Sequence, residues 1–524
     1  MKIFIQKSVL LLAVVVLLSG CKKEFQNLYV NPNKPTSVPA SLLLNNVMNA
    51  MLEAPGGQLD RTNQYQLQNN SYFGNNQYDF GPGSNLYPTL INVVNMEATA
   101  ASSGVGDLNP YHALGKFFRA YYFSKMSLQM GDIPMTQALQ GAAMLTPVYD
   151  PQKTIFINCL NLLDQSNSDL TALIAANNTT LAGDMYFANN LKAWQKVVNT
   201  YRLRLLIHLS KKTADADLNV AQQFAMIVGN PAKYPIMQSS SDDLKYTWLD
   251  PTNRYPLNKE TFANGALNNS ADTYVGLLTA KSDPRVFITT DPAPQLVTAG
   301  GSPTAFSSFQ GGNIGLDIGV LASQNGGGIL SYINRYRYYA GYTGEPTAII
   351  NYTEMCFNIA EAINRGWLTT GPLGNAEAYY NAGIQSSMAF YGIPQTGSMT
   401  VYSLPLGIPV TGPYVSGTVN VNYANYYAQP LVKYAGDNAT GLQQIIEQKY
   451  VAFYLNSGLE AYFNWRRTGI PTFKTGVGTA NNGKIALRYK YFTSEQSANL
   501  ANYNAAIAQY NNVDDVNGVM WILK

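Results

Sequence analysis

The chain has 524 residues, long enough for several conventional cores or one large one, and only 12% of them are charged. A net charge of +3 without a basic stripe argues against a nucleic-acid-binding protein. With two histidines, no HExxH, no cysteine–histidine cluster at zinc spacing and no GxxxxGK(S/T), the sequence has no motif of a zinc enzyme or a P-loop nucleotidase. Amides, hydroxyls and 37 tyrosines supply its polarity, which suits neutral, hydroxyl-rich ligands such as sugars, and equally suits a cell-surface adhesin.

The first twenty residues have the pattern of a secretory signal peptide. Lys2 and Lys7 precede a short apolar run that ends at Leu18, and the run is too short to span a membrane. The following "LSGC" resembles the bacterial lipobox, whose cysteine becomes the lipidated first residue of the mature protein. We therefore predict a signal peptide over 1–20, lipidation of Cys21 and a polar tether over 21–38 that anchors the protein to a membrane.

Helical periodicity and breakers predict a mainly α-helical chain with long irregular loops and a few short hairpins. From 229 to 345 the chain becomes irregular and glycine-rich, and a loop of that length is commonly functional. The turn 367–375 is short enough to fold its two flanking helices into an antiparallel pair that loosely resembles a tetratricopeptide unit. The helices are expected at 40–53, 86–101, 110–130, 154–175, 189–211, 219–228, 345–366, 376–391, 441–455 and 494–510.

Two internal cysteines and one histidine are interpreted as packing residues. Cys159 and Cys356 lie far apart in the sequence and specify no disulfide, and free cysteine is commonly buried. His208 lies on an amphipathic helical pattern, which favours a packed rather than a catalytic role.

The adjacent arginines Arg466 and Arg467 also have a structural interpretation. They precede Thr-Gly-Ile-Pro, in which Gly469 can adopt the left-handed conformation that ends a helix and proline cannot continue it. A positive charge near a helix C-terminus interacts favourably with the helix dipole and stabilises the helix by about 0.3–1 kcal/mol. Glu447 or Glu460 is the expected ion-pair partner, so we interpret the arginines as structural rather than ligand-clamping.

The segment 447–471, "EQKYVAFYLNSGLEAYFNWRRTGIP", resembles the C-terminal signature of the SusD/RagB family of nutrient-binding outer-membrane lipoproteins. Further similarities follow in order along the chain: "NPNKPTS", "GDIP", "DPR", "NYTEMCFNIAEAINRGW" and "LRYKYF". Phe492 replaces the family's usual proline, and "VMWILK" replaces a more typical double tryptophan.

The resemblance implies a tetratricopeptide-like helix-pair scaffold, a right-handed superhelix, in a single ligand-binding domain over 39–524. It implies a non-enzymatic protein, held on the outer membrane by its lipid anchor and facing the outside of the cell. We assign no cofactor and no metal site from the sequence, and whether a loop binds calcium is left open. Such a protein binds a glycan or a peptide and delivers it to a SusC-like TonB-dependent transporter.

Ligand contacts are expected in two loops that combine aromatic faces with amides or guanidinium groups. Each of these side chains has an alternative role, packed beneath its own loop. The candidates are Tyr72, Phe73, Asn76, Tyr78 and Asp79 in the first loop, and Trp248, Asn334, Arg335, Tyr336 and Arg337 in the mid-chain region.

Three other functions remain open from the sequence. A glycan-degrading enzyme requires two carboxylates flanking a cleft, whereas Asp242 and Asp243 are adjacent and resemble a solvated loop or a helix start. A structural adhesin would have no affinity for a soluble ligand. A peptide-binding homologue is the closest alternative, because composition barely separates it from a glycan-binding one.

Overall fold

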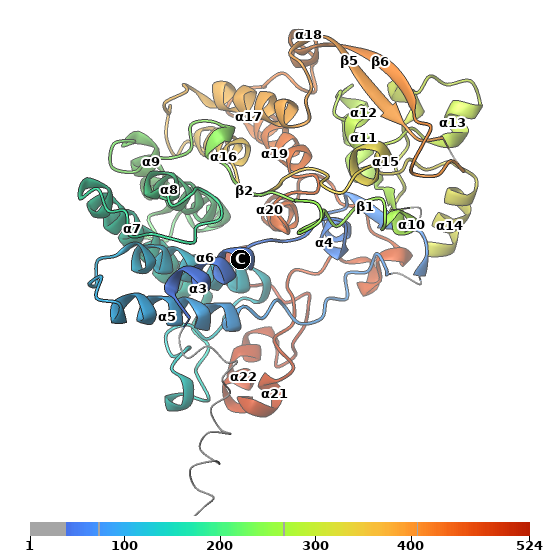
Figure 1. Cartoon of the computed structure of the whole chain (residues 1–524). Coiled ribbons are helices and arrows are strands. Elements are labelled where there is room, and N and C mark those ends of the chain that lie inside the picture. The colour runs from blue at the N-terminus through green and yellow to red at the C-terminus, as the bar shows by residue number, and fades with distance from the viewer. Residues whose placement is uncertain (1–37, 72–73, 266–267, 406) are drawn as a thin grey trace, which may run out of the picture.

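The computed structural model describes residues 38–71, 74–265, 268–405 and 407–524. Helices dominate it, and strands occur as short two-stranded ribbons (Figure 1). The helices are α3 (Ala40–Asn49), α4 (Gln58–Thr62), α5 (Tyr87–Ser102), α6 (Pro110–Met130), α7 (Gln152–Ala175), α8 (Leu191–His208), α9 (Val220–Gly229), α10 (Phe262–Gly265), α11 (Asp272–Ala280), α12 (Val286–Thr289), α13 (Pro294–Thr298), α14 (Ile318–Gly326), α15 (Arg335–Tyr339), α16 (Tyr352–Asn364), α17 (Ala376–Phe390), α18 (Tyr423–Tyr427), α19 (Ala439–Ala452), α20 (Glu460–Thr468), α21 (Glu495–Ala498) and α22 (Leu500–Ile507). The predicted signal peptide and Cys21 lie outside the described residues.

The strands form three antiparallel ribbons. The strands β1 (Gln66–Gln68) and β3 (Asn268–Ser270) pair, as do β2 (Leu244–Tyr246) and β4 (Thr347–Ile350), so two ribbons join segments far apart in the sequence. The third is a local hairpin of β5 (Thr396–Ser403) and β6 (Val415–Asn422). The long helices α5 to α9 gather on one side of the molecule, and α11 to α15 lie with this hairpin on the other (Figure 1).

The long helices begin and end where capping chemistry requires. The helix α6 starts with Pro110 at its first position, and the Asn109 side chain accepts a hydrogen bond from the His112 amide. It ends at Gly131, whose positive φ of 94° favours glycine. Between α16 and α17, Gly383 permits close contact, since a Cβ there would lie 2.7 Å from the Phe357 ring. The predicted antiparallel pair is therefore confirmed.

Sequence periodicity was wrong at one helix start. The helix expected from 345 is preceded by strand β4, and α16 begins only at Tyr352. The run Thr-Ala-Ile-Ile pairs with β2, more than 100 residues earlier, and Asn351 then caps α16 by accepting a hydrogen bond from the Glu354 amide. Similarly, the irregular segment 229–345 contains β2, β3 and several short helices, and the last predicted helix is divided into α21 and α22.

The helix α20 confirms the predicted stop at Gly469, which has φ 75° in the left-handed region. The predicted partners of the arginines were wrong. Arg467 pairs with Glu361 of α16, whereas Glu460 pairs with His208 and Glu447 with Lys281. Seven helical residues separate Glu460 from Arg467 by about 10 Å along the axis, which is too far for an ion pair. Arg466 donates to the carbonyls of Leu128 and Leu487, both at 2.7 Å, so both arginines hold the scaffold together.

The buried apolar side chains form one cluster that extends from Ala40 to Ile522, with a small satellite cluster beside β1 and α14. Cys159 and Cys356 are both fully buried and free, as expected for packing residues. Burial raises the pKa of the Cys356 thiol to about 12. Among the helices of the described residues, none combines the length and apolarity needed to cross a bilayer.

Candidate functional site

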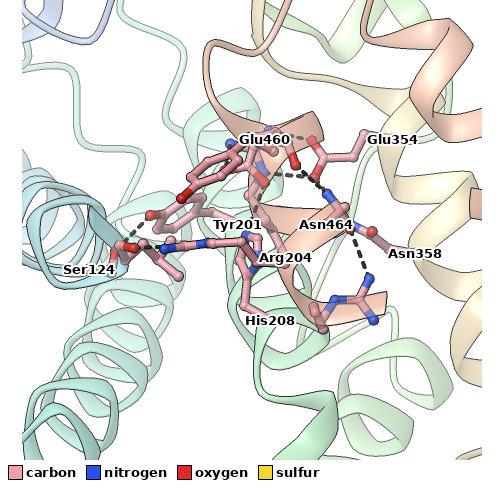
Figure 2. A network of polar contacts seen from close by, with 12 residues as sticks. Ser124, Tyr201, Arg204, His208, Glu354, Asn358, Glu460 and Asn464 are labelled. Atoms are coloured by element: carbon pink, nitrogen blue, oxygen red, sulfur yellow. Dashed lines mark hydrogen bonds and ion pairs between the residues drawn. The ribbon is translucent and has the colours of Figure 1, made fainter. Parts of the chain in front are cut away.

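A buried network of charged and polar side chains joins helices α8, α16, α19 and α20 (Figure 2). The guanidinium of Arg204 forms a two-bond ion pair with Glu354, and His208 lies 2.9 Å from the Glu460 carboxylate. Lys449 donates to Asn358 and Asn464 at 2.6 and 3.0 Å. Burial raises the pKa of Glu460, but His208 and Arg204 lower it further, to about 2.

This network lacks room for a ligand. The cavity bordered by Arg204 and Glu460 measures about 20 Å³, which holds roughly one water molecule. Its donors and acceptors are instead directed at one another, so the network fixes the packing of the four helices. His208 is thus a packed residue, as the sequence predicted.

The described residues of the first candidate loop mainly brace the loop itself. Asn76 is buried and exchanges two hydrogen bonds with the backbone of Gln68, at 2.7 and 2.9 Å. Tyr78 is buried and donates its hydroxyl to the Thr62 carbonyl at 2.9 Å. Asp79 is exposed. Tyr72 and Phe73 lie outside the described residues.

Four of the mid-chain candidates are tied into the fold. Trp248 is buried and donates its indole N–H to Thr347 at 3.0 Å. Asn334 caps α15 and donates to the Tyr402 carbonyl at 2.9 Å. The remaining two, Arg335 and Arg337, pair with Asp291 and Glu345 at 2.6 and 2.7 Å.

Tyr336 is the most accessible of the mid-chain candidates, with 41% of its surface exposed. Its ring stacks on Tyr402 at a centroid distance of 4.2 Å and an angle of 28°. The ring of Tyr414 meets it edge-on at 4.9 Å and 78°. We call Tyr336, Tyr402 and Tyr414 the tyrosine cluster. Asn334 and Arg335 position it, because both donate hydrogen bonds to the backbone at the end of β5.

A cavity of about 450 Å³ adjoins this cluster at the end of the β5–β6 hairpin. Ser403 and Val415 line the cavity, and their chain neighbours Tyr402 and Tyr414 belong to the cluster. The opposite wall comes from the Pro294–Thr298 helix α13 and from the glycines 326–328 that end α14. Its volume lies within the 300–1,000 Å³ that is typical of small-molecule sites. The exposed ring of Tyr336 and the half-buried rings of Tyr402 and Tyr414, together with a cavity of this size, can hold one or two sugar rings or a short peptide.

The two candidate regions meet through Asn269 of β3. This residue accepts a hydrogen bond from Asn69 at 2.6 Å and forms a bridge with Tyr332, three residues before Arg335. The segment that leads into the first loop therefore contacts the mid-chain region through β3, while Trp248 packs elsewhere, against Tyr246 and Tyr255.

Sequence reasoning missed Tyr402 and Tyr414. The available signal was the pair of eight-residue segments with two-residue alternation that flank a loop rich in proline and glycine, a pattern typical of a hairpin. Across the described part of the chain, no group of three or more His, Cys, Asp or Glu side chains is arranged to hold a metal ion.

Comparison with known proteins identifies the family. Residues 32–492 match the model of a SusD-like family described as starch-binding associating with outer membrane. The chain belongs to this SusD-like family, because the match covers most of its length. No curated protein is similar to the sequence at a significant level.

Solved structures share the fold. A SusD homologue from Bacteroides fragilis has 27% identity and a TM-score of 0.79, and the match covers 93% of this chain and 100% of that one. A second SusD homologue from the same species has 28% identity and a TM-score of 0.76, with the same coverage. A chitin-binding SusD homologue from Flavobacterium johnsoniae has 19% identity and a TM-score of 0.69, covering 93% of this chain and 98% of that one. The predicted mainly α-helical, tetratricopeptide-like fold is thereby confirmed.

Proposed function

We propose that the protein binds oligosaccharide nutrients at the outer membrane and that its tyrosine cluster is the binding platform. The observation that carries this proposal is the stacked pair of the exposed Tyr336 and the half-buried Tyr402, near a cavity of about 450 Å³. Sugar rings present C–H groups, which are attracted to the negative face of an aromatic ring. The cluster offers aromatic faces for such contacts and contains no charged side chain, so it suits a neutral ligand.

The family supplies further support for the ligand class. Its description names starch binding, and one structural relative is described as chitin-binding. Residues at the cluster are held by a rigid scaffold, since Arg335 beneath it is buried and paired with Asp291. A preformed platform reduces the entropy lost on binding.

The same proposal includes the place of the protein in the cell. A lipid on Cys21 would anchor it to the outer membrane facing outwards, and a SusC-like TonB-dependent transporter would receive the ligand. Labelling with radioactive palmitate should fail in C21S, and the transporter should co-purify with the unaltered lipoprotein. Removal of the protein from intact cells by an added protease would test its orientation.

Calorimetry on residues 22–524 tests the binding function directly. The titrants are starch-type and chitin-type oligosaccharides, other neutral polysaccharides and a peptide digest. Binding of one glycan class without turnover, weakened by Tyr336→Ala and Tyr402→Ala, is the expected result. Tyr342→Ala is the matched control, because Tyr342 packs against Arg254 and Lys259 away from the cluster.

Three other results would contradict the proposal. Heat from peptides but from no glycan would identify a peptide-binding homologue. Release of reducing ends from a glycan would indicate an enzyme. Glycan binding that is unchanged in both cluster variants would place the site elsewhere.

A further inference from the structure

A second cavity lies between the helix pair α16–α17 and the β2–β4 ribbon, and it differs from the tyrosine site in every residue of its wall. Its volume is about 200 Å³, below the range that is typical of sites for drug-sized ligands. We call it the helix-pair cavity. A ligand enclosed there is no larger than a single ring.

Two polar side chains on its wall keep one hydrogen-bonding atom uncommitted. Asp243 accepts the Tyr352 amide through Oδ1 at 2.8 Å, while its Oδ2 accepts no hydrogen bond from the described residues. Asn351 is buried and accepts the Glu354 amide through Oδ1 at 2.7 Å, while its Nδ2 donates to none of the described residues. Backbone amides at the start of α16 therefore occupy Oδ1 of each side chain. Oδ2 of Asp243 remains as an acceptor at the cavity, and Nδ2 of Asn351 remains as a donor.

The rest of the wall complements this pair. The hydroxyls of Thr353 and Ser386 lie 2.8 Å apart, and Lys245 is exposed at the wall. The partly buried Phe390, which ends α17, adds an aromatic surface. Burial raises the pKa of Asp243 to about 6, although the Tyr352 amide and Lys245 oppose the rise. A carboxylate that is desolvated to this extent gains from hydroxyl donors supplied by a ligand.

We propose that the helix-pair cavity is a separate binding site for one monosaccharide ring or a polyol of similar size. One ligand hydroxyl donates to Asp243 Oδ2, a neighbouring oxygen accepts from Asn351 Nδ2, and the C–H face of the ring packs on Phe390. The wall carries one acidic and one basic side chain, Asp243 and Lys245, so it has no net charge that would select a charged ligand over a neutral one. The proposal stands without the proposed function, because it concerns a free sugar and residues outside the tyrosine cluster.

Saturation-transfer NMR on residues 22–524 tests this site with glucose, galactose, mannose, N-acetylglucosamine and myo-inositol as probes. At least one should bind saturably at millimolar concentration. Asp243→Asn keeps Oδ1 and replaces the free acceptor, so it should weaken binding about ten-fold or more. Asp242→Asn is the matched control, since Asp242 is the adjacent residue, pairs with Lys196 and does not line the cavity.

A second variant separates loss of the site from loss of the fold. Ala389 is exposed and lines the cavity, so Ala389→Trp should fill it and abolish binding while the melting temperature stays unchanged. Tyr402→Ala should leave monosaccharide binding intact. The proposal is wrong if none of the five probes binds, or if binding survives Ala389→Trp. Loss of binding in Tyr402→Ala alone would assign the monosaccharide to the tyrosine cluster instead.

Discussion

Replacing Glu361 with glutamine is expected to destabilise the helix scaffold by roughly 3 kcal/mol at neutral pH. Glu361 is fully buried in α16 and accepts hydrogen bonds from Arg467 at 2.9 Å and from Arg365 at 2.8 Å. Burial raises the pKa of its carboxyl, but the two arginines lower it further, from the usual 4.5 to about 2. At about 1.4 kcal/mol for each pH unit, this difference corresponds to roughly 3 kcal/mol. Removing one partner of a buried ion pair has a similar effect, about 3–5 kcal/mol.

The pH dependence identifies the cause. Because the folded-state pKa of Glu361 lies below the unfolded value, its contribution is complete above about pH 4.5 and is lost as the pH falls towards 2. Urea unfolding followed by tryptophan fluorescence at pH 7, 5 and 3 should therefore show a gap between the unaltered chain and Glu361→Gln that narrows in acid. Other titrating groups, such as Asp60 with its pKa raised to about 6, contribute to both proteins and cancel in the comparison.

A matched substitution on the surface supplies the control. Glu260 pairs with Arg254 in solvent, and Glu260→Gln should leave the unfolding midpoint unchanged at every pH. The reasoning is refuted if Glu361→Gln is as stable as the unaltered chain at pH 7, or if the gap between them remains constant down to pH 3.

Three further changes test other parts of the structure. Gly469→Ala should lower the free energy of unfolding by about 1 kcal/mol through backbone strain alone, because φ is 75° and an added Cβ meets no atom within 4 Å; Gly81→Ala, equally open but without a positive φ, should be neutral in the same urea titration. In residues 22–524, Cys159 and Cys356 should not react with a thiol reagent until urea is added, since burial raises the pKa of both thiols; reaction in the folded protein would contradict their burial. Tyr402→Ala should weaken glycan binding five- to thirty-fold by calorimetry, which is typical of removing a central aromatic contact, and Tyr402→Phe should retain most of the affinity.

The fold was largely predictable because its causes are local. The start of α6 is signalled by Asn109 and Pro110, and the end of α20 by Gly469, which are local features of the sequence. Helical periodicity then predicts the residues between such start and stop signals. The sequence-based predictions were wrong where contacts between distant segments determine the structure. Strand β4 exists because it pairs with β2, and Arg467 finds Glu361 106 residues away. No local pattern contains either partner.

The candidate site was predictable only in part, because composition does not distinguish a buried polar residue from an exposed one. Tyr78 and Tyr336 stand in equally polar, aromatic-rich segments, yet Tyr78 is buried with its hydroxyl bonded to a backbone carbonyl, and Tyr336 is exposed. What separates them is the hairpin that brings Tyr402 and Tyr414 to Tyr336. The sequence predicted loops as the binding elements but could not indicate which loop meets which.

The residues that reveal the family are also the residues least able to reveal its ligand. The signature arginines Arg466 and Arg467 are buried, and their hydrogen bonds end on carbonyls and side chains of the scaffold. These contacts join parts of the scaffold, so they carry no information about the ligand. The tyrosine cluster lies instead on the short helix α15, on strand β5 and just before β6, where replacing a ring changes the proposed binding surface and leaves the helical core intact. Relatives that share the scaffold can therefore bind different ligands, and substitutions at Tyr336 and Tyr402 test the proposed site of this chain.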